Sequence, residues 1–552
     1  MKRIFRNYRQ LLAVSVFCLA YLPMACLGDT VTFKGSVDEV LRSSDAPRVA
    51  EETLYAAPEI GRMYASTGYQ PLWNEQAIAS LGRALDGLAQ DGLTPFDYRF
   101  ATIDGQLSAP DLASLPSARA AELDMLFTES FLRAVYHLYF GKADPERLDS
   151  DINFARAMPD EDPVPLLLGH IQRANIGAAF DWARPDSRHY EALKKGLAIY
   201  RSYQASGGWE QIAAGETLKV GATGPRVAAV RQRLAVSGDW SGSLVTSGAA
   251  FFDADLEAAI KRFQTRHGLD VDGAVGPVTL QALNLSAADR VEQIRVNLDR
   301  ERWVQHHEYD EYLVTDLAGF EVFWAKDGEV LWREDAQVGK EFTKTPIFGG
   351  EIKYLEFNPT WTIPPGILRR SVIPGLKEDP DYLEKRGYHL LTQTGKRVDP
   401  KTVDWQTLKG FPYIVRQPAG PDNALGLVKF IFPNPHFVFL HDTNHRELFD
   451  RSKRTFSSGC IRVRNPFDLA ERLLADKQGW DRQRIDAVIA SGKTTRVNLD
   501  KPMRVIVVYN TARVPAGESE VHFRVDVYDR DASVLKALNG PFRLRKREAE
   551  KS

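Results

Sequence analysis

The residues best suited to chemistry in this sequence lie between His441 and Arg462. His441 follows the apolar run 437–440, so a strand can deliver its imidazole at a strand end, where a side chain leaves the core. Cys460 stands in a loop of small residues. A cysteine reacts as the thiolate, and a nearby imidazole can take its proton if a third group orients the ring. The pattern therefore predicts a cysteine nucleophile with His441 as its base.

The neighbours of Cys460 suit this chemistry. The preceding pair Ser458-Gly459 offers a close approach and successive backbone N–H groups that can hold an oxyanion. Arg462 can bind a substrate carboxylate or form a structural ion pair, and both readings stay open. The stretch 465–468 (Asn-Pro-Phe-Asp) reads as a helix start with Asn465 as its cap. Cys460 is thus expected in a rigid setting between a strand and a helix.

Two other readings compete with a nucleophilic cysteine. His441 and His445 have the spacing of metal ligands on a helix, and His436 is near. The prolines at 433 and 435 and the strand pattern argue against such a helix, so we predict no metal site. The second alternative is a small buried hydrophobe, which is the commonest role of a free cysteine.

The remaining cysteines point to export. The chain starts with a basic stretch, followed by the uncharged run 11–22 and the small-residue region 23–28, the order of a secretory signal peptide. Cleavage near Gly28-Asp29 would remove Cys18 and Cys26 and leave Cys460 as the only thiol. We therefore expect an exported mature chain without stable membrane insertion; an uncleaved leader would act as an anchor.

Composition indicates several globular domains and no nucleic-acid binder. The 552 residues are 44% hydrophobic and 26% charged, with a net charge of −2. Residues 51–209 show helical periodicity, whereas the chain alternates as in strands after Trp303, and residues 378–425 interrupt those strands like an inserted lid. The fold class expected is multidomain α+β.

A repeated turn motif marks a small unit at residues 218–285. Gly221-Ala-Thr-Gly-Pro225 returns as Gly273-Ala-Val-Gly-Pro277, and three short amphipathic helices fit around the two copies. Together with the stretch 263–269 (Phe-Gln-Thr-Arg-His-Gly-Leu), these residues resemble the peptidoglycan-binding domain 1 family. The resemblance implies binding to the cell wall; a helical spacer with the same turns is the alternative.

The region around Cys460 resembles the L,D-transpeptidase (YkuD-type) catalytic domain. The match rests on a histidine after a strand, then Ser-x-Gly-Cys-x-Arg, with further similarity at 338–340, 345–346 and 358–365. Shorter family members carry histidine where Ser458 stands here. The whole chain is most similar to the long, YcbB-like members. This resemblance implies five regions: a signal peptide 1–28, a helical scaffold 29–215, a peptidoglycan-binding domain 216–286, a catalytic domain 305–515 with a cap at about 375–427, and a C-terminal extension 516–552.

The resemblance also implies a reaction. Cys460 would attack the carbonyl of the third residue of a tetrapeptide stem, with His441 as base and then acid, a backbone carbonyl orienting the ring, and Ser458, Gly459 and Arg462 around the substrate. An amine of a second stem would resolve the thioester into a 3→3 cross-link in the periplasm, without a cofactor, and carbapenems would acylate the same thiol. Other readings are an L,D-carboxypeptidase, an enzyme that attaches protein to peptidoglycan, and a wall-binding scaffold without activity. Cell-wall synthesis or wall-modifying proteins are further expected partners.

Overall fold

The computed structural model describes residues 24–44, 46–107, 112–153, 161–242, 250–304, 310–408 and 410–542. The chain forms two compact units. The first comprises residues up to 85 together with 98–134 and 159–181, and the second comprises 86–97, 135–158 and 182–552. Most of the expected signal peptide, residues 1–23, lies outside the described residues; 24–28 lie in the first helix.

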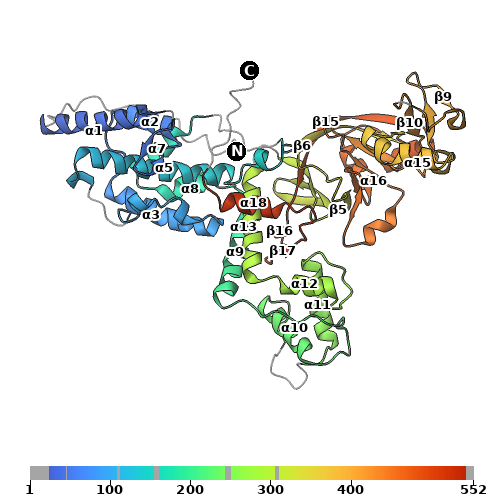
Figure 1. The fold of residues 1–552 in the computed structure, drawn as a ribbon, viewed down its shortest axis with the longest axis horizontal. Helices are drawn as coiled ribbons and strands as arrows, with labels where there is room; N and C mark the ends of the chain where they lie inside the picture. Colours follow the sequence, from blue (N-terminus) through green and yellow to red (C-terminus); the bar gives the residue numbers. More distant parts are fainter. Residues whose placement is uncertain are drawn as a thin grey trace. The chain divides into compact units, whose positions relative to one another are not determined.

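The first unit is helical, as the periodicity predicts (Figure 1). Buried Asp124 ties its helices to a loop, because its carboxylate accepts hydrogen bonds from the hydroxyl of Tyr64 at 2.7 Å and from the amides of Leu72 and Trp73. Elements that lie wholly or mainly in this unit are α1 (Met24–Arg42), β1 (Arg48–Val49), β2 (Glu52–Thr53), α2 (Ala57–Ser66), α3 (Glu75–Gly87), α4 (Ala101–Asp104), η4 (Leu112–Ser114), α5 (Ser117–Phe140), α7 (Val164–Gln172) and α8 (Ile176–Ala183).

Two long helices organise the start of the second unit, α9 (Arg188–Ala205) and α13 (Ala287–Trp303). Arg302 is fully buried between them and donates to Asp299 at 2.9 Å and to the hydroxyl of Tyr190 at 2.8 Å. Such a buried charge is tolerated because it is paired and hydrogen-bonded. Shorter helices of this unit are η2 (Leu88–Asp91), η3 (Pro95–Asp97), α6 (Pro145–Leu148) and α18 (Asp531–Leu538).

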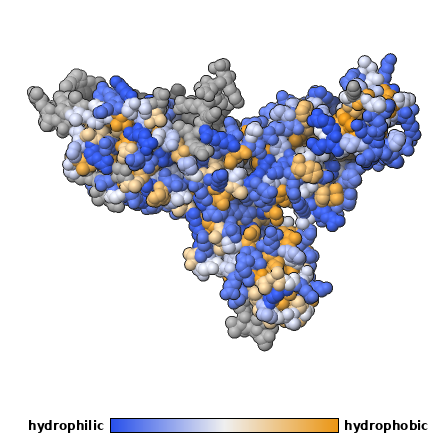
Figure 2. All heavy atoms as spheres, viewed as in Figure 1, coloured by the Kyte–Doolittle hydropathy of each residue, from blue (hydrophilic) through white to orange (hydrophobic). Residues whose placement is uncertain are grey.

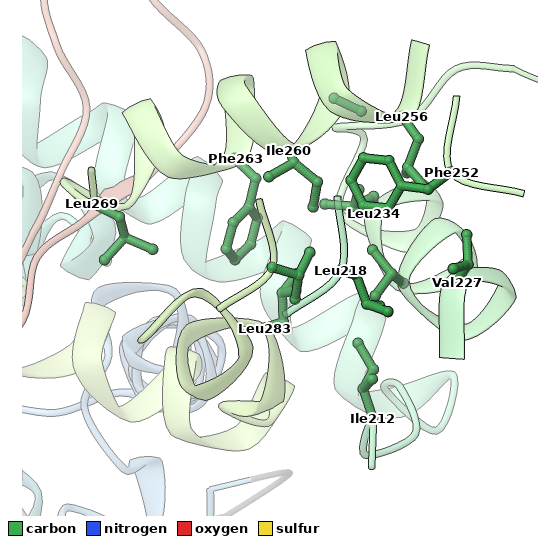
Figure 3. Packing of buried hydrophobic residues seen from close by; sticks show 13 residues of the cluster. Ile212, Leu218, Val227, Leu234, Phe252, Leu256, Ile260, Phe263, Leu269 and Leu283 are labelled. Atoms are coloured by element: carbon green, nitrogen blue, oxygen red, sulfur yellow. The ribbon is translucent and has the colours of Figure 1, made fainter. Parts of the chain in front are cut away.

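The three expected helices of the repeat unit are present: α10 (Pro225–Val236), α11 (Ala254–Arg266) and α12 (Pro277–Asn284). The second turn motif is tied to the start of the unit, since Val275 exchanges backbone hydrogen bonds with Leu218. Figure 3 shows the apolar side chains that the three helices and their turns turn inward. This small core explains how about seventy residues form a separate module.

A closed sheet forms the β-rich domain. Nine strands pair in the order β13-β5-β14-β12-β11-β6-β15-β3-β4, and β4 also pairs with β5, so the sheet returns on itself. The strands are β3 (Glu311–Asp316), β4 (Glu321–Lys326), β5 (Glu329–Gly339), β6 (Gly349–Phe357), β11 (Val428–Ile431), β12 (Leu440–His441), β13 (Thr455–Ser457), β14 (Ile461–Val463) and β15 (Thr495–Val508). Helices η8 (Arg446–Asp450), α16 (Pro466–Leu473) and α17 (Arg482–Ala490) complete it. The hairpin of β16 (Ala512–Arg513) and β17 (His522–Phe523) packs in a core with α9 and α13.

The insertion between β6 and β11 is a subdomain with its own core. Its four-stranded sheet has the order β7-β10-β8-β9. Its core begins at Ile363, before the expected cap start near residue 375, and beside it lies a largely apolar cavity of 680 Å³. The elements are β7 (Trp361–Thr362), α14 (Pro365–Ile367), η5 (Leu368–Val372), α15 (Ile373–Glu378), η6 (Glu384–Arg386), β8 (His389–Leu391), β9 (Arg397–Val398), η7 (Pro400–Thr402) and β10 (Ile414–Gln417).

The surface of the molecule mixes polar and apolar residues. On the face drawn in Figure 2, hydrophobic residues form small patches among hydrophilic ones. Across the described ranges, no helix combines the length and the apolar character needed to cross a bilayer.

Candidate active site

A row of polar side chains crosses the closed sheet at the level of His441. Gln337 of β5 is paired with Arg462 of β14, and Arg462 is paired with His441 of β12. On its other side, His441 is paired with Lys429 of β11, and Lys429 is paired with Glu356 of β6. Side chains of paired residues in neighbouring strands stand on the same face. The fold therefore gathers these five side chains from strands far apart in the sequence.

Cys460 joins the same face. It precedes β14 and lies two residues from Arg462, and side chains two apart in extended chain point to the same side. The next residue, Ile461, donates its amide to the carbonyl of Phe439 at 2.9 Å, which fixes the chain beside β12. The thiol is free and half-buried, and its Sγ lies 3.7 Å from the carbonyl oxygen of Phe437. The structure thus brings Cys460 to the strand that ends at His441.

The imidazole of His441 is oriented by a backbone carbonyl, as the resemblance implied. Its Nδ1 lies 2.5 Å from the carbonyl oxygen of Asp442, so Nδ1 carries the proton and Nε2 remains an acceptor. Asp442 is itself held, because its carboxylate accepts from the amide of Leu427 at 2.9 Å and from Arg446 at 2.7 Å. Burial, reinforced by the positive charges of Arg462 and Lys429, lowers the pKa of His441 to about 3. The ring is therefore neutral.

The thiol is neutral as well. Burial raises the pKa of Cys460, while the backbone amide of Phe439 and the cations Lys429 and Arg462 act in the opposite direction. Burial in turn lowers the pKa of Lys429, and Cys460 counteracts that shift. The resting site is thus a neutral thiol and a neutral imidazole facing two cations, which favours a negative charge that develops on sulfur during reaction. Lys429 was not identified from the sequence.

Arg462 lies on the same face of the sheet as Cys460 and has a polar neighbour on β5. Its Nη1 donates to Oε1 of Gln337 at 3.1 Å. Within the described ranges its Nε is a buried donor without a hydrogen-bond partner. Buried donors are usually hydrogen-bonded, so this Nε is available to a group that enters beside Cys460.

The loop before Cys460 has one amide already engaged. Gly459 adopts φ +123°, a conformation that favours glycine, and its N–H donates to Oγ of Ser457 at 3.0 Å. Its carbonyl accepts from Oγ1 of Thr345 at 2.9 Å. Ser458 is exposed. The amide of Gly459 was expected to form part of an oxyanion hole. In the structure it donates to Ser457 and holds the loop instead.

His436 and His445, the other two histidines of the possible metal site, lie near different carboxylates. Nδ1 of His445 lies 3.4 Å from Glu447, and Nδ1 of His436 lies 3.8 Å from Asp151. His441 ends strand β12 rather than lying on a helix with His445. Part of the local sequence reading also changes: Asn465 occupies the N-cap position of α16, but its side chain donates to Glu334 at 2.8 Å instead of capping the helix.

Comparison with protein-family models assigns three regions of the chain. Residues 310–501 match "L,D-transpeptidase catalytic domain", residues 58–197 match "Scaffold domain", and residues 223–283 match "Putative peptidoglycan binding domain". The stretch 310–501 is thus similar to an L,D-transpeptidase catalytic domain. The half-buried thiol and the neutral imidazole described above lie within it.

Similar proteins carry the same description. A Haemophilus influenzae protein described as "Putative L,D-transpeptidase" is 34% identical over 206 residues, which are 37% of this chain and 42% of that protein, so the chain spans less than half of that relative. The solved L,D-transpeptidase of Xylanimonas cellulosilytica is 16% identical and covers 54% of this chain and 99% of its own, with a TM-score of 0.18. That of Stackebrandtia nassauensis is 14% identical, covers 53% and 95%, and has a TM-score of 0.22.

Proposed function

We propose that this protein is a periplasmic L,D-transpeptidase that forms 3→3 cross-links between peptidoglycan stems through a thioester at Cys460. The observation that carries the proposal is the oriented, neutral imidazole of His441 on the face that also bears Cys460, Arg462 and Lys429. This arrangement supplies a nucleophile, a base with one acceptor nitrogen, and two cations for developing negative charge. The match of residues 310–501 to the catalytic-domain family supports it.

The first half of the reaction acylates the enzyme. The thiol proton moves to Nε2 of His441 as sulfur attacks the carbonyl carbon of the third residue of a donor tetrapeptide. The charge of the tetrahedral intermediate is stabilised by the backbone amides of Ser458 and Cys460, because the amide of Gly459 is engaged by Ser457. Its collapse breaks the bond to the terminal D-alanine, whose nitrogen takes the proton from His441. A thioester and a neutral imidazole remain.

The second half transfers the acyl group. The side-chain amine of an acceptor stem attacks the thioester carbonyl and gives a proton to His441. The bond to sulfur breaks, and the thiol regains that proton, so that the enzyme returns to its resting state with one new amide. Arg462, whose Nε is a buried donor without a partner in the described part of the chain, is assigned to a carboxylate of the stem.

The remaining regions serve localisation. The match of residues 223–283 to a peptidoglycan-binding family supports a role in holding the enzyme on the wall. The N-terminal segment is assigned to export, with cleavage near Gly28. Proteins that build or modify the wall are the partners this assignment implies.

The function is tested by incubating the purified chain with disaccharide-tetrapeptide muropeptides and separating the products by liquid chromatography and mass spectrometry. Dimers linked between two third residues support the proposal. Tripeptides without dimers indicate water as acceptor, hence an L,D-carboxypeptidase, and muropeptides attached to an added protein indicate an attachment enzyme. Unchanged muropeptides together with binding to sacculi would leave a wall-binding scaffold.

A further inference from the structure

The loop that joins β5 to β6 holds the backbone immediately before Cys460. The hydroxyl of Thr345 accepts a hydrogen bond from the amide of Gly339 at 2.9 Å and donates to the carbonyl of Gly459 at 2.9 Å. Gly339 must be glycine at this point, because a Cβ atom there would lie 2.1 Å from the carbonyl oxygen of Thr343. The loop is therefore tightly folded and bonded directly to the residue that precedes the nucleophile.

A single tyrosine from the C-terminal part of the chain joins the two ends of that loop. Tyr528 is fully buried, and its hydroxyl donates to the carbonyl of Gly339 at 2.6 Å. The same hydroxyl oxygen accepts from the amide of Thr345 at 3.4 Å. Tyr528 lies outside residues 310–501, the stretch that matches the catalytic-domain family. The hydroxyl is thus placed to fix the loop from outside the matched domain.

Tyr528 is itself held rigidly. Its ring stacks on that of Tyr509 with centroids 5.6 Å apart, and its amide donates to the hydroxyl of Tyr509 at 2.9 Å. The hydroxyl of Tyr509 donates in turn to Asp526 at 2.6 Å, and Nζ of Lys344 donates to the carbonyl of Tyr528 at 2.5 Å. A side chain locked by packing and hydrogen bonds can transmit a fixed position to the groups it contacts.

We propose that Tyr528 is a positioning residue for the nucleophile loop. It acts through Gly339 and Thr345 on Gly459, whose backbone sets the direction of the Cys460 amide and thiol. The inference rests on the proposed function, because it assumes acylation at Cys460. Misplacing a reacting group by about 1 Å can cost roughly 100-fold in rate, so loss of the Tyr528 hydroxyl is expected to slow chemistry by about 10- to 100-fold.

The test compares Tyr528→Phe with Tyr64→Phe in the full chain. Both variants remove one buried hydroxyl with a hydrogen bond of similar length, but Tyr64 lies in the first unit and bonds to Asp124. Acylation of Cys460 by a carbapenem is followed by mass spectrometry at increasing drug concentration, which separates the limiting rate from the half-saturating concentration. Tyr528→Phe should lower the limiting rate and leave the half-saturating concentration near that of wild type. Tyr64→Phe should match wild type in both.

A double variant distinguishes positioning from general destabilisation. Thr345→Val keeps the shape of the side chain but removes the hydroxyl bonded to Gly459. If Tyr528 acts through this loop, the rate losses of Tyr528→Phe and Thr345→Val are strongly non-additive when combined. A limiting rate in Tyr528→Phe equal to that of Tyr64→Phe, or additive losses, would overturn the inference. Wild-type enzyme that is not acylated at Cys460 would instead refute the proposed function itself.

Discussion

Acylation of Cys460 should be independent of pH between about pH 5 and pH 8. The expectation follows from the resting protonation of the site, where burial, Arg462 and Lys429 lower the pKa of His441 to about 3 and burial raises the pKa of Cys460. If the reactive form is neutral imidazole with neutral thiol, its population is constant across that range, because neither group titrates there.

A histidine with an ordinary pKa would make the acylation rate depend strongly on pH. With an unperturbed pKa of about 6.5, only about 3% of the imidazole would be neutral at pH 5, and the rate would fall roughly 30-fold from its value at pH 8. With a pKa of about 3, about 99% remains neutral at pH 5 and the rate is unchanged.

The assay is the second-order rate of carbapenem acylation at Cys460, measured by mass spectrometry with a drug that has no titrating group in this range. Circular dichroism at each pH serves as the control for folding. In His441→Ala only the thiolate reacts, so the rate should rise about tenfold per pH unit and be lower by about 10²–10⁴-fold near pH 7. A wild-type acylation rate that falls about 30-fold as the pH is lowered from 8 to 5, with a midpoint near pH 6.5, would refute the neutral resting pair.

Three further predictions follow from single side chains and from the leader. Lys429→Gln should slow acylation roughly tenfold, because the charge of Lys429 lowers the pKa of the Cys460 thiol, whereas exposed Lys353→Gln on neighbouring β6 should not; equal rates for the two variants would remove Lys429 from the site. Gly426→Ala places a Cβ atom 2.4 Å from the carboxylate of Asp442, which should cost about 1–3 kcal/mol of unfolding free energy beyond that of Gly387→Ala. Gly387 has a similar φ (+63° against +61°) but open space around it, so equal denaturation midpoints would contradict the contact. N-terminal sequencing of protein recovered from cells should begin near Asp29; an intact Met1 in a cytosolic fraction would contradict export.

The sequence predicted those features that depend on local pattern. The three helices of residues 218–285 could be placed because proline, glycine and apolar periodicity mark their ends and faces. The closeness of His441 to Cys460 could be expected from the family resemblance and from the strand that ends at His441. These signals reside in short stretches, so a single sequence carries them.

What the sequence did not predict depends on register between distant strands. Lys429 has no distinguishing neighbours in the sequence, and it enters the site because β11 pairs with β12 after the long insertion. The contact of Tyr528 with Gly339 joins residues 189 positions apart. The engagement of the Gly459 amide by Ser457 is a matter of loop geometry. One residue of slip in β11 would turn Lys429 to the opposite face of the sheet, and strand pairing is decided by the whole core rather than by local pattern.

The proposed nucleophile, Cys460, is tested most directly by the mass of the protein after incubation with a carbapenem. Wild type should gain one drug mass, which peptide sequencing places on Cys460. Cys460→Ser should gain none, because a serine hydroxyl is far harder to ionise beside one imidazole than a thiol. It should also form no 3→3 dimers from disaccharide-tetrapeptides. An unmodified Cys460 in folded wild type, or a Cys460→Ser variant that cross-links as fast as wild type, would contradict the assignment.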